Sequence, residues 1–184
     1  MPAGFPSHQG LILPLWRRFP REIDGVALCV GAIVPDLVDA PLRPGGPGQW
    51  AGHSLVGLFT LCLVAGLALS RLARRALPAR WIARLDEGAP PAPGAGREAL
   101  SVLIGAASHI AFDFVTHGNF WLLWPWLDNP RVFPEWWYYT WMTFRCPPYR
   151  EPIRVAPHFI SWLLFSIAGV VLFFRCLRPR AARG

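Results

Sequence analysis

The stretch HSLVGLFTLCLVAGLALS, from His53 to Ser70, contains no charged side chain and is followed at once by Arg71. A helix of about 20 apolar residues, rising 1.5 Å per residue, spans the hydrocarbon core of a bilayer. The stretch from His158 to Phe174 is as apolar and is followed by Arg175 and Arg178. Both stretches therefore predict membrane-spanning helices.

Two further apolar stretches carry polar residues. Ala99 to His117 has the length of a spanning helix but contains His109 and Asp113. Ile23 to Ala40 is interrupted by the Pro35–Asp36 pair. Because proline lacks a backbone N–H, we expect the helix to bend or end there.

These stretches predict an all-α fold, a polytopic transmembrane helical bundle with about four spanning helices. The shorter segment from His8 to Trp16 adds an N-terminal helix that is tilted, re-entrant or interfacial, because it is too short to span alone. We expect residues 1–184 to form a single membrane domain. Residues 71–97, rich in arginine and proline, are expected to be a linker without a core-forming pattern. Residues 118–157 are expected to form a tryptophan-rich extracytoplasmic loop, whose tryptophans are either an interfacial belt or a substrate-facing surface.

Composition and charge point to lipid as the main solvent. Hydrophobic residues make up 53% of the chain and charged residues 16%, against about 25% charged in soluble domains. The net charge is +7, and all 18 cationic side chains are arginine. These arginines flank apolar segments, so we attribute them to membrane topology and expect no nucleic-acid partner. The four cysteines form no C-x-x-C pair and predict neither a disulfide framework nor a thiolate zinc site.

The arginines also predict an orientation. Thirteen fall on one side of the predicted spans and five on the other. The side with more arginines is expected to be cytoplasmic. The chain would then be a multi-pass protein of the bacterial inner (cytoplasmic) membrane with a cytoplasmic C-terminus. All five histidines would lie at or below the extracytoplasmic face.

A regular spacing of histidine and aspartate marks the candidate site. In His109-x-x-x-Asp113-x-x-x-His117, neighbours four apart lie about 40° apart around a helix and about 6 Å apart along it. His109 and Asp113 can therefore reach one ion together. A mixed imidazole and carboxylate set suits a divalent metal, with zinc the first choice and manganese or iron as alternatives. The predicted metal ligands are His8, Asp36, His53, His109, Asp113 and His117.

Each candidate also has a structural interpretation. An aspartate in a spanning helix is costly and usually has a partner, so Asp113 could hydrogen-bond His109 or a neighbouring helix. Asp36 or Asp39 could cap the break in its helix. His53 could be an interfacial residue at a helix start.

Three further groups have similar alternatives. His8 could be a loop residue, and His158 is expected only to begin its helix. The arginines of the long loop could hold a phosphate group, although solvated loop charges are the simpler interpretation.

Five motifs of the chain resemble those of a known family. They are P-S-H (6–8), G-A-I-V-P-D (31–36), H-S-L-V-G-L (53–58), S-H-I-A-F-D-F-V-T-H (108–117) and R-E-P-I-R-V-A-P-H (150–158). In this combination the chain resembles domain-of-unknown-function family 4184, a family of bacterial membrane proteins. That family is distantly similar to predicted membrane-bound metal-dependent hydrolases, in which such His and Pro-Asp motifs are taken as metal ligands. The resemblance implies a polytopic helical protein and a hydrolase.

The preferred functional hypothesis is a metal-dependent hydrolase at the outer membrane boundary. Its substrate would be a phosphoester or another lipid-linked bond, and membrane lipid is the expected partner. A carboxylate that does not bind the metal, Asp36 or Asp39, would serve as general base. The alternative is a non-catalytic metal-binding, transport or structural membrane protein, because intramembrane His and Asp also mark ion pathways. No nucleophile elbow, P-loop or G-x-G-x-x-G occurs, and the oligomeric state is not predicted.

Overall fold

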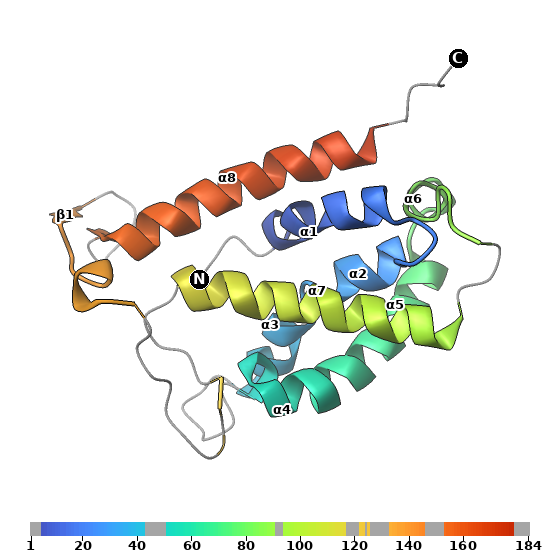
Figure 1. The fold of residues 1–184 in the computed structure, drawn as a ribbon, viewed down its shortest axis with the longest axis horizontal. Helices are drawn as coiled ribbons and strands as arrows, with labels where there is room; N and C mark the ends of the chain where they lie inside the picture. The colour runs from blue at the N-terminus through green and yellow to red at the C-terminus, as the bar shows by residue number, and fades with distance from the viewer. Residues whose placement is uncertain are drawn as a thin grey trace.

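The computed structural model describes residues 5–42, 51–90, 94–116, 122–123, 125, 133–145 and 153–178. Most of its regular structure is helical (Figure 1). The α-helices are α1 (Ser7–Arg18), α2 (Gly25–Gly31), α3 (Val34–Asp39), α4 (Leu55–Gly57), α5 (Leu63–Ala76), α6 (Ala79–Leu85), α7 (Ala95–Thr116) and α8 (Pro157–Leu177). The short segments are η1 (Ala40–Leu42), η2 (Ala51–His53), the π-helical η3 (Leu58–Cys62), η4 (Glu135–Trp137), β1 (Met142–Phe144) and β2 (Ile153–Val155).

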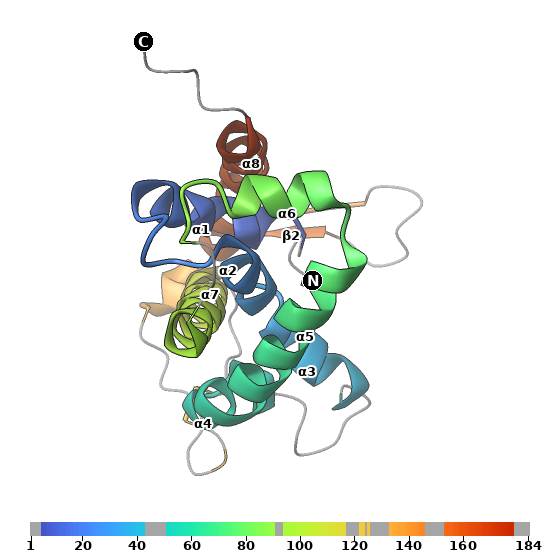
Figure 2. The ribbon, with the colours of Figure 1, turned by 90° about the vertical axis from the view of Figure 1, so that its right-hand side faces the viewer.

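The helices pack around the short helix α2, which contacts α1, α5 and α7. Seen end-on, α1 and α8 lie on one side of α7, while α5 lies on another side, and α2 fits between them (Figure 2). In the most apolar stretch of α7, 44% of the residues are buried, whereas the corresponding share for α8 is 17%. Helix α8 therefore forms the outer edge of the bundle. The predicted fold class, a polytopic helical bundle, is confirmed.

Among the described residues, three helices are long and apolar enough to cross a membrane. They are α7, α8 and the continuous helix Leu55–Ala76, which comprises α4, η3 and α5. We predicted about four. The remaining stretch is divided, because α2 ends at Gly31 and α3 begins at Val34 with Pro35 in its first turn. Proline suits that position, since its missing N–H would have no partner there. The predicted break is confirmed, and two short helices stand where a fourth span was expected.

Helix α1, the predicted short N-terminal helix, packs against α8 backbone to backbone. A Cβ atom at Gly10 would lie 1.7 Å from the carbonyl oxygen of Gly169. A Cβ atom at Gly169 would lie 2.1 Å from the carbonyl oxygen of Ser7. Small residues allow helices in membranes to approach this closely. The glycines thus fix the position of α1, and of the His8 that it carries.

We expect Gly10→Ala to destabilise the protein, because the new methyl group meets backbone atoms that cannot rotate away. Overpacking of this kind lowers the free energy of unfolding by about 1–3 kcal/mol. Gly96→Ala is the matched control, since its Cβ would meet nothing within 4 Å. Alanine is also the better helix former by about 1 kcal/mol. Thermal denaturation in detergent should show a lower midpoint for Gly10→Ala only, and equal midpoints would contradict the close α1–α8 contact.

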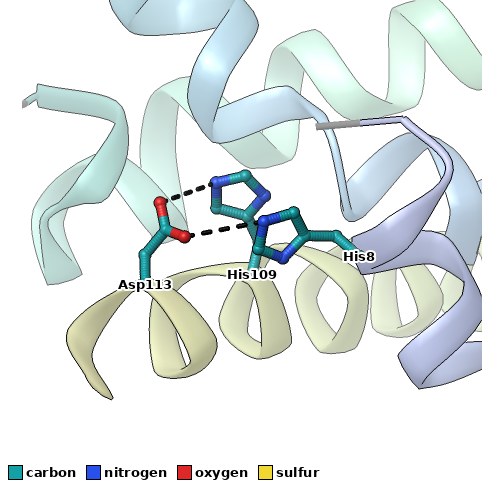
Figure 3. Close-up of side chains that lie close together, drawn as sticks. All are labelled: His8, His109 and Asp113. Atoms are coloured by element: carbon teal, nitrogen blue, oxygen red, sulfur yellow. Dashed lines mark ion pairs between the residues drawn. The ribbon is translucent and has the colours of Figure 1, made fainter. Parts of the chain in front are cut away.

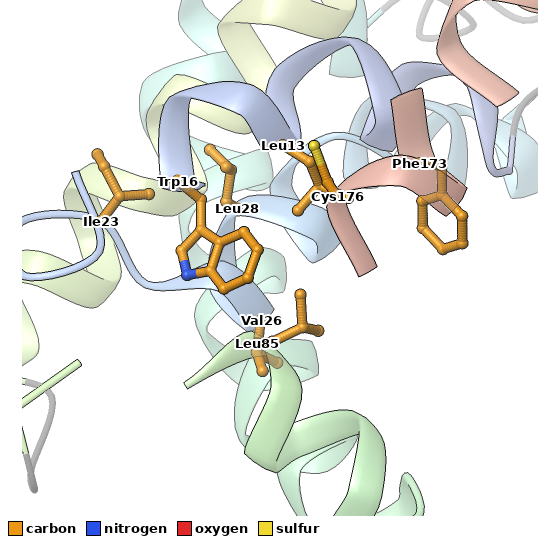
Figure 4. Packing of buried hydrophobic residues seen from close by; sticks show 8 residues of the cluster. All are labelled: Leu13, Trp16, Ile23, Val26, Leu28, Leu85, Phe173 and Cys176. Atoms are coloured by element: carbon orange, nitrogen blue, oxygen red, sulfur yellow. The ribbon is translucent and has the colours of Figure 1, made fainter. Parts of the chain in front are cut away.

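One apolar cluster joins α1, α2, α6 and α8 at one end of the bundle (Figure 4). It includes Leu85 of α6, which is buried, and Ile82 packs against the same cluster. The two residues lie three apart and therefore share one face of the helix. Leu85 and Ile82 therefore attach α6, part of the segment 71–97, to the core. The other buried members are Leu13, Trp16, Ile23, Val26, Leu28, Phe173 and Cys176.

The arginine-rich helix ends lie together at this end of the bundle. The Arg17 guanidinium donates to the carbonyl oxygen of Arg175 at 2.8 Å, and the Arg97 guanidinium donates to that of Arg21 at 3.3 Å. These contacts join the end of α1 to the end of α8, and the start of α7 to the α1–α2 turn. The grouping expected from the sequence holds for these arginines, while its assignment to the cytoplasm stays a prediction.

The expected tryptophan-rich loop contains short regular elements. Strands β1 and β2 pair antiparallel, with Met142 opposite Val155. The indole N–H of Trp137, in η4, donates to the Val115 carbonyl oxygen at 3.1 Å and so ties the loop to the end of α7. That the tryptophans form either an interfacial belt or a substrate-facing surface stays a prediction.

Candidate metal centre

Helix α7 supplies two candidate ligands from one face. The Nε2 atom of His109 lies 3.3 Å from Asp113 Oδ2. The Nδ1 atom of His109 lies 2.9 Å from the Ala32 carbonyl oxygen. A carbonyl oxygen only accepts hydrogen bonds, so in the neutral ring the proton belongs on Nδ1. The Nε2 lone pair of His109 is then available to a metal ion.

Two glycines bring that carbonyl to the histidine. A Cβ at Gly31 would lie 2.3 Å from a backbone oxygen of α7, and one at Gly105 would lie 2.3 Å from a backbone oxygen of α2. The two helices therefore touch through their backbones. Because α2 ends at this contact, the Ala32 carbonyl that follows it lies within hydrogen-bond distance of His109.

His53 enters the site from the start of the first spanning helix. It ends η2, and the Ser54 hydroxyl caps the following helix by accepting from the Gly57 N–H at 2.9 Å. His53 Nδ1 lies 2.5 Å from Asp39 Oδ2, and Asp39 Oδ1 accepts from the Gly52 N–H at 2.6 Å. Both oxygens of Asp39 are engaged, and its contact with Nδ1 leaves His53 Nε2 for a metal ion.

Three ligand atoms form a nearly equilateral triangle. His53 Nε2 and His109 Nε2 lie 3.2 Å apart, and each lies 3.3 Å from Asp113 Oδ2. Ligands on a tetrahedral zinc ion, at bond lengths of about 2.0–2.1 Å, stand about 3.3 Å from one another. The triangle therefore matches one face of a zinc tetrahedron. Two imidazoles and one carboxylate also form a ligand set of catalytic zinc sites, in which the fourth position stays open.

Helix α1 places His8 beside this triangle. Its ring stacks on that of His109, with centroids 4.1 Å apart, and its Nε2 lies 3.5 Å from Asp113 Oδ1. The two oxygens of Asp113 thus face different histidines, as Figure 3 shows. Ligand atoms of His8, His109 and Asp113 all lie within 4.8 Å of one another, so this group could also hold an ion.

Asp36 approaches the cluster from α3. Its oxygens are 3.9 Å from the Nε2 atoms of His53 and His109. Its side chain is 23% exposed, whereas those of Asp39 and Asp113 are 2% and 6% exposed. Asp36 is therefore the acidic group of the cluster with the best access from outside. It can act as a further ligand or hold a water molecule beside the triangle.

The carboxylates make this a site for positive charge. Burial alone would lower the pKa of His53, but the hydrogen bonds and charges of Asp113 and Asp39 raise that pKa to about 9. A buried imidazole that favours its cationic form marks a position at which negative charge exceeds positive charge. A divalent ion would balance the three carboxylates in the same place.

The structure brings together most of the predicted ligands. His117 lies outside the described residues. His158 lies elsewhere, with Nδ1 3.2 Å from the Trp137 carbonyl oxygen and its ring near Tyr138, in keeping with the expectation that it only begins α8. The ligands that meet are His8, Asp36, His53, His109 and Asp113.

Two groups around the site have no counterpart among the predicted residues. They are the Ala32 carbonyl, which orients His109, and the Gly52 N–H, which orients Asp39. Both belong to the backbone, so residue type alone carries no signal for either.

We expect Asp39→Asn to weaken metal binding by about 10–100-fold without abolishing it, as is typical of groups that orient a histidine ligand. The amide has the same shape but lacks the negative charge that holds His53. Chelator competition on detergent-purified protein measures the affinity. Glu22→Gln, an exposed acidic residue at the arginine-rich end, is the control. Equal affinities for Asp39→Asn and wild type would show that Asp39 does not support the site.

Fold and cluster together define a class: a polytopic helical membrane protein with a buried histidine–aspartate cluster at one end of its bundle. The chain belongs to the family described as Domain of unknown function (DUF4184), which matches residues 1–147. The match covers all five clustered residues and ends before α8. No curated protein and no solved structure matches the chain.

Proposed function

We propose that this protein is a metal-dependent hydrolase that acts at the extracytoplasmic boundary of the bacterial inner membrane, on a phosphoester or another lipid-linked bond. The observation that carries the proposal is the triangle of His53 Nε2, His109 Nε2 and Asp113 Oδ2, with edges of 3.2–3.3 Å. Its dimensions and donor atoms fit a zinc ion, and each histidine has a partner that holds its Nδ1.

The residues around the triangle have different roles in the proposed reaction. A divalent ion, zinc first, would acidify a water molecule and polarise the scissile bond. Asp36 is the better general base, because it is 23% exposed and lies 3.9 Å from both histidines. Asp39 has both oxygens engaged with Gly52 and His53, so we assign it the positioning of His53.

The position of the cluster supports a substrate in the membrane. Asp113 lies in the last turn of α7, His53 precedes the first span, and His8 lies in the first turn of α1. The arginines of these helices lie at their other ends, near the ends of α1 and α5 and near the start of α7. By the positive-inside rule, the cluster would face the extracytoplasmic boundary, where lipid head groups and ester bonds lie. A reporter fused after Gly184 should then be cytoplasmic.

Burial of the site favours a second candidate, a non-catalytic metal-binding protein. His109 is 0% and His53 2% exposed, which also suits an ion held for structure or transport. The test is turnover of a panel of phospholipids and lipid-linked phosphates by zinc-loaded protein in detergent. Hydrolysis that is lost in Asp113→Asn supports the enzyme, while stoichiometric metal without hydrolysis of any panel member favours the second candidate.

A further inference from the structure

A small pocket lies directly beside the metal centre. It encloses about 230 Å³, part of it open to the outside, between α1, α7 and α8. His8 lines it, and the same ring stacks on His109, so one side chain separates the pocket from the cluster. The space is small and opens to the outside, so it suits a single group of a larger molecule.

Two hydrogen-bond donors of the pocket are buried without a partner. The hydroxyl of Ser7, a residue 3% exposed, and the indole N–H of Trp162 make no hydrogen bond to any described residue. Buried donors are nearly always paired, and an indole N–H can only donate. These groups come from α1 and α8, and a ligand that offers acceptor oxygens would supply the partners that they lack.

The other walls indicate what kind of acceptor fits. The rings of Phe112 and Phe165 line the pocket with centroids 5.4 Å apart, and His8 is the one titratable side chain among the described residues that line it. A phosphate would find no guanidinium among these described residues, whereas an uncharged carbonyl attached to an alkyl chain would find two donors and aromatic walls. The pocket also lies between α7 and α8, two helices able to span the membrane, and the neighbouring Leu163 and Leu164 of α8 are exposed.

We infer that this pocket binds the acyl-ester carbonyl of a glycerolipid through Ser7 and Trp162. This inference rests on the proposed function and names the substrate class: with its carbonyl in the pocket, the lipid's head group would extend past His8 towards Asp113 and Asp36. The pocket would thereby set which bond of the lipid reaches the cluster.

The test compares two lipids that differ only in this carbonyl. Dihexanoyl phosphatidylcholine has ester carbonyls, and its dihexyl ether analogue has none. Native mass spectrometry of the full-length protein in detergent measures the binding of each. We expect wild type to prefer the diester, and Ser7→Ala and Trp162→Phe each to weaken diester binding by about three- to ten-fold, the effect of one neutral hydrogen bond. Ether binding should not change.

Ser161→Ala is the matched control, since the Ser161 hydroxyl already donates to the His158 carbonyl oxygen at 2.8 Å. Equal binding of both lipids by wild type would overturn the inference, as would a diester preference that survives in both variants. Metal content measured on the same samples separates the two proposals. An ester preference without bound metal would support ester binding in the pocket and contradict the proposed hydrolase. Bound metal and turnover without an ester preference would support the hydrolase and contradict ester binding in the pocket.

Discussion

Asp113→Ala is expected to lower the affinity for zinc by at least about 100-fold, beyond the range seen when only an orienting group is lost. Asp113 is the centre of the cluster, because one oxygen lies 3.3 Å from both His53 and His109 and the other lies 3.5 Å from His8. Its removal takes away a ligand and the charge that the histidines share. Zinc stoichiometry and chelator competition on detergent-purified protein measure the loss.

Folding must be followed in the same samples, since Asp113 is buried. Asp113→Asn keeps the shape of the side chain and should also lose affinity, with helical circular dichroism unchanged. Glu22→Gln, exposed and at the other end of the bundle, should bind zinc as wild type does. Full zinc occupancy in a folded Asp113→Ala protein would mean that the triangle is not the metal site.

Asp36→Asn is expected to have the opposite pattern, in which the protein keeps its metal and loses turnover. A positioned general base contributes about 10²–10⁴-fold to a rate, so kcat should fall by that amount. The reason is geometric: Asp36 is 3.9 Å from the histidine nitrogens, farther than the 3.2–3.3 Å edges of the triangle. Zinc content and turnover of the most active lipid of the panel are measured together.

The comparison with Asp39→Asn makes this result specific. That variant should bind metal less tightly but recover its turnover when zinc is added, whereas added zinc should not rescue Asp36→Asn. Loss of zinc from Asp36→Asn would instead make Asp36 a fourth ligand, and unchanged kcat would remove it from the reaction.

Much of the fold could be predicted from local patterns of the chain. Long uncharged stretches predicted the spans, and the spacing of His109 and Asp113 placed both on one face of α7, because helical geometry is local. The break at Pro35 followed from the chemistry of proline. The consequence of that break could not be predicted, because no local sequence pattern distinguishes a kinked spanning helix from two short helices.

The parts that could not be predicted depend on contacts between distant segments. Asp39 was interpreted as a cap or a base, but it contacts and orients His53, a residue of a different segment. The contact of Gly31 with Gly105 sets the position of the Ala32 carbonyl, yet any glycine could equally mark a turn. Leu85 packs in the core, although the composition of the neighbouring sequence is typical of a linker. Such pairings are decided by packing, which a single sequence does not display.

The central claim is that His53, His109 and Asp113 bind one metal ion through two imidazole nitrogens and a carboxylate oxygen. The most direct measurement is metal analysis of the detergent-purified protein, followed by X-ray absorption at the edge of the metal found. We expect zinc at one ion per chain or more, with nitrogen and oxygen ligands at about 2.0–2.1 Å and two imidazole signatures. Protein that stays metal-free after zinc addition, or a sulfur shell at about 2.3 Å from cysteine, would contradict the account.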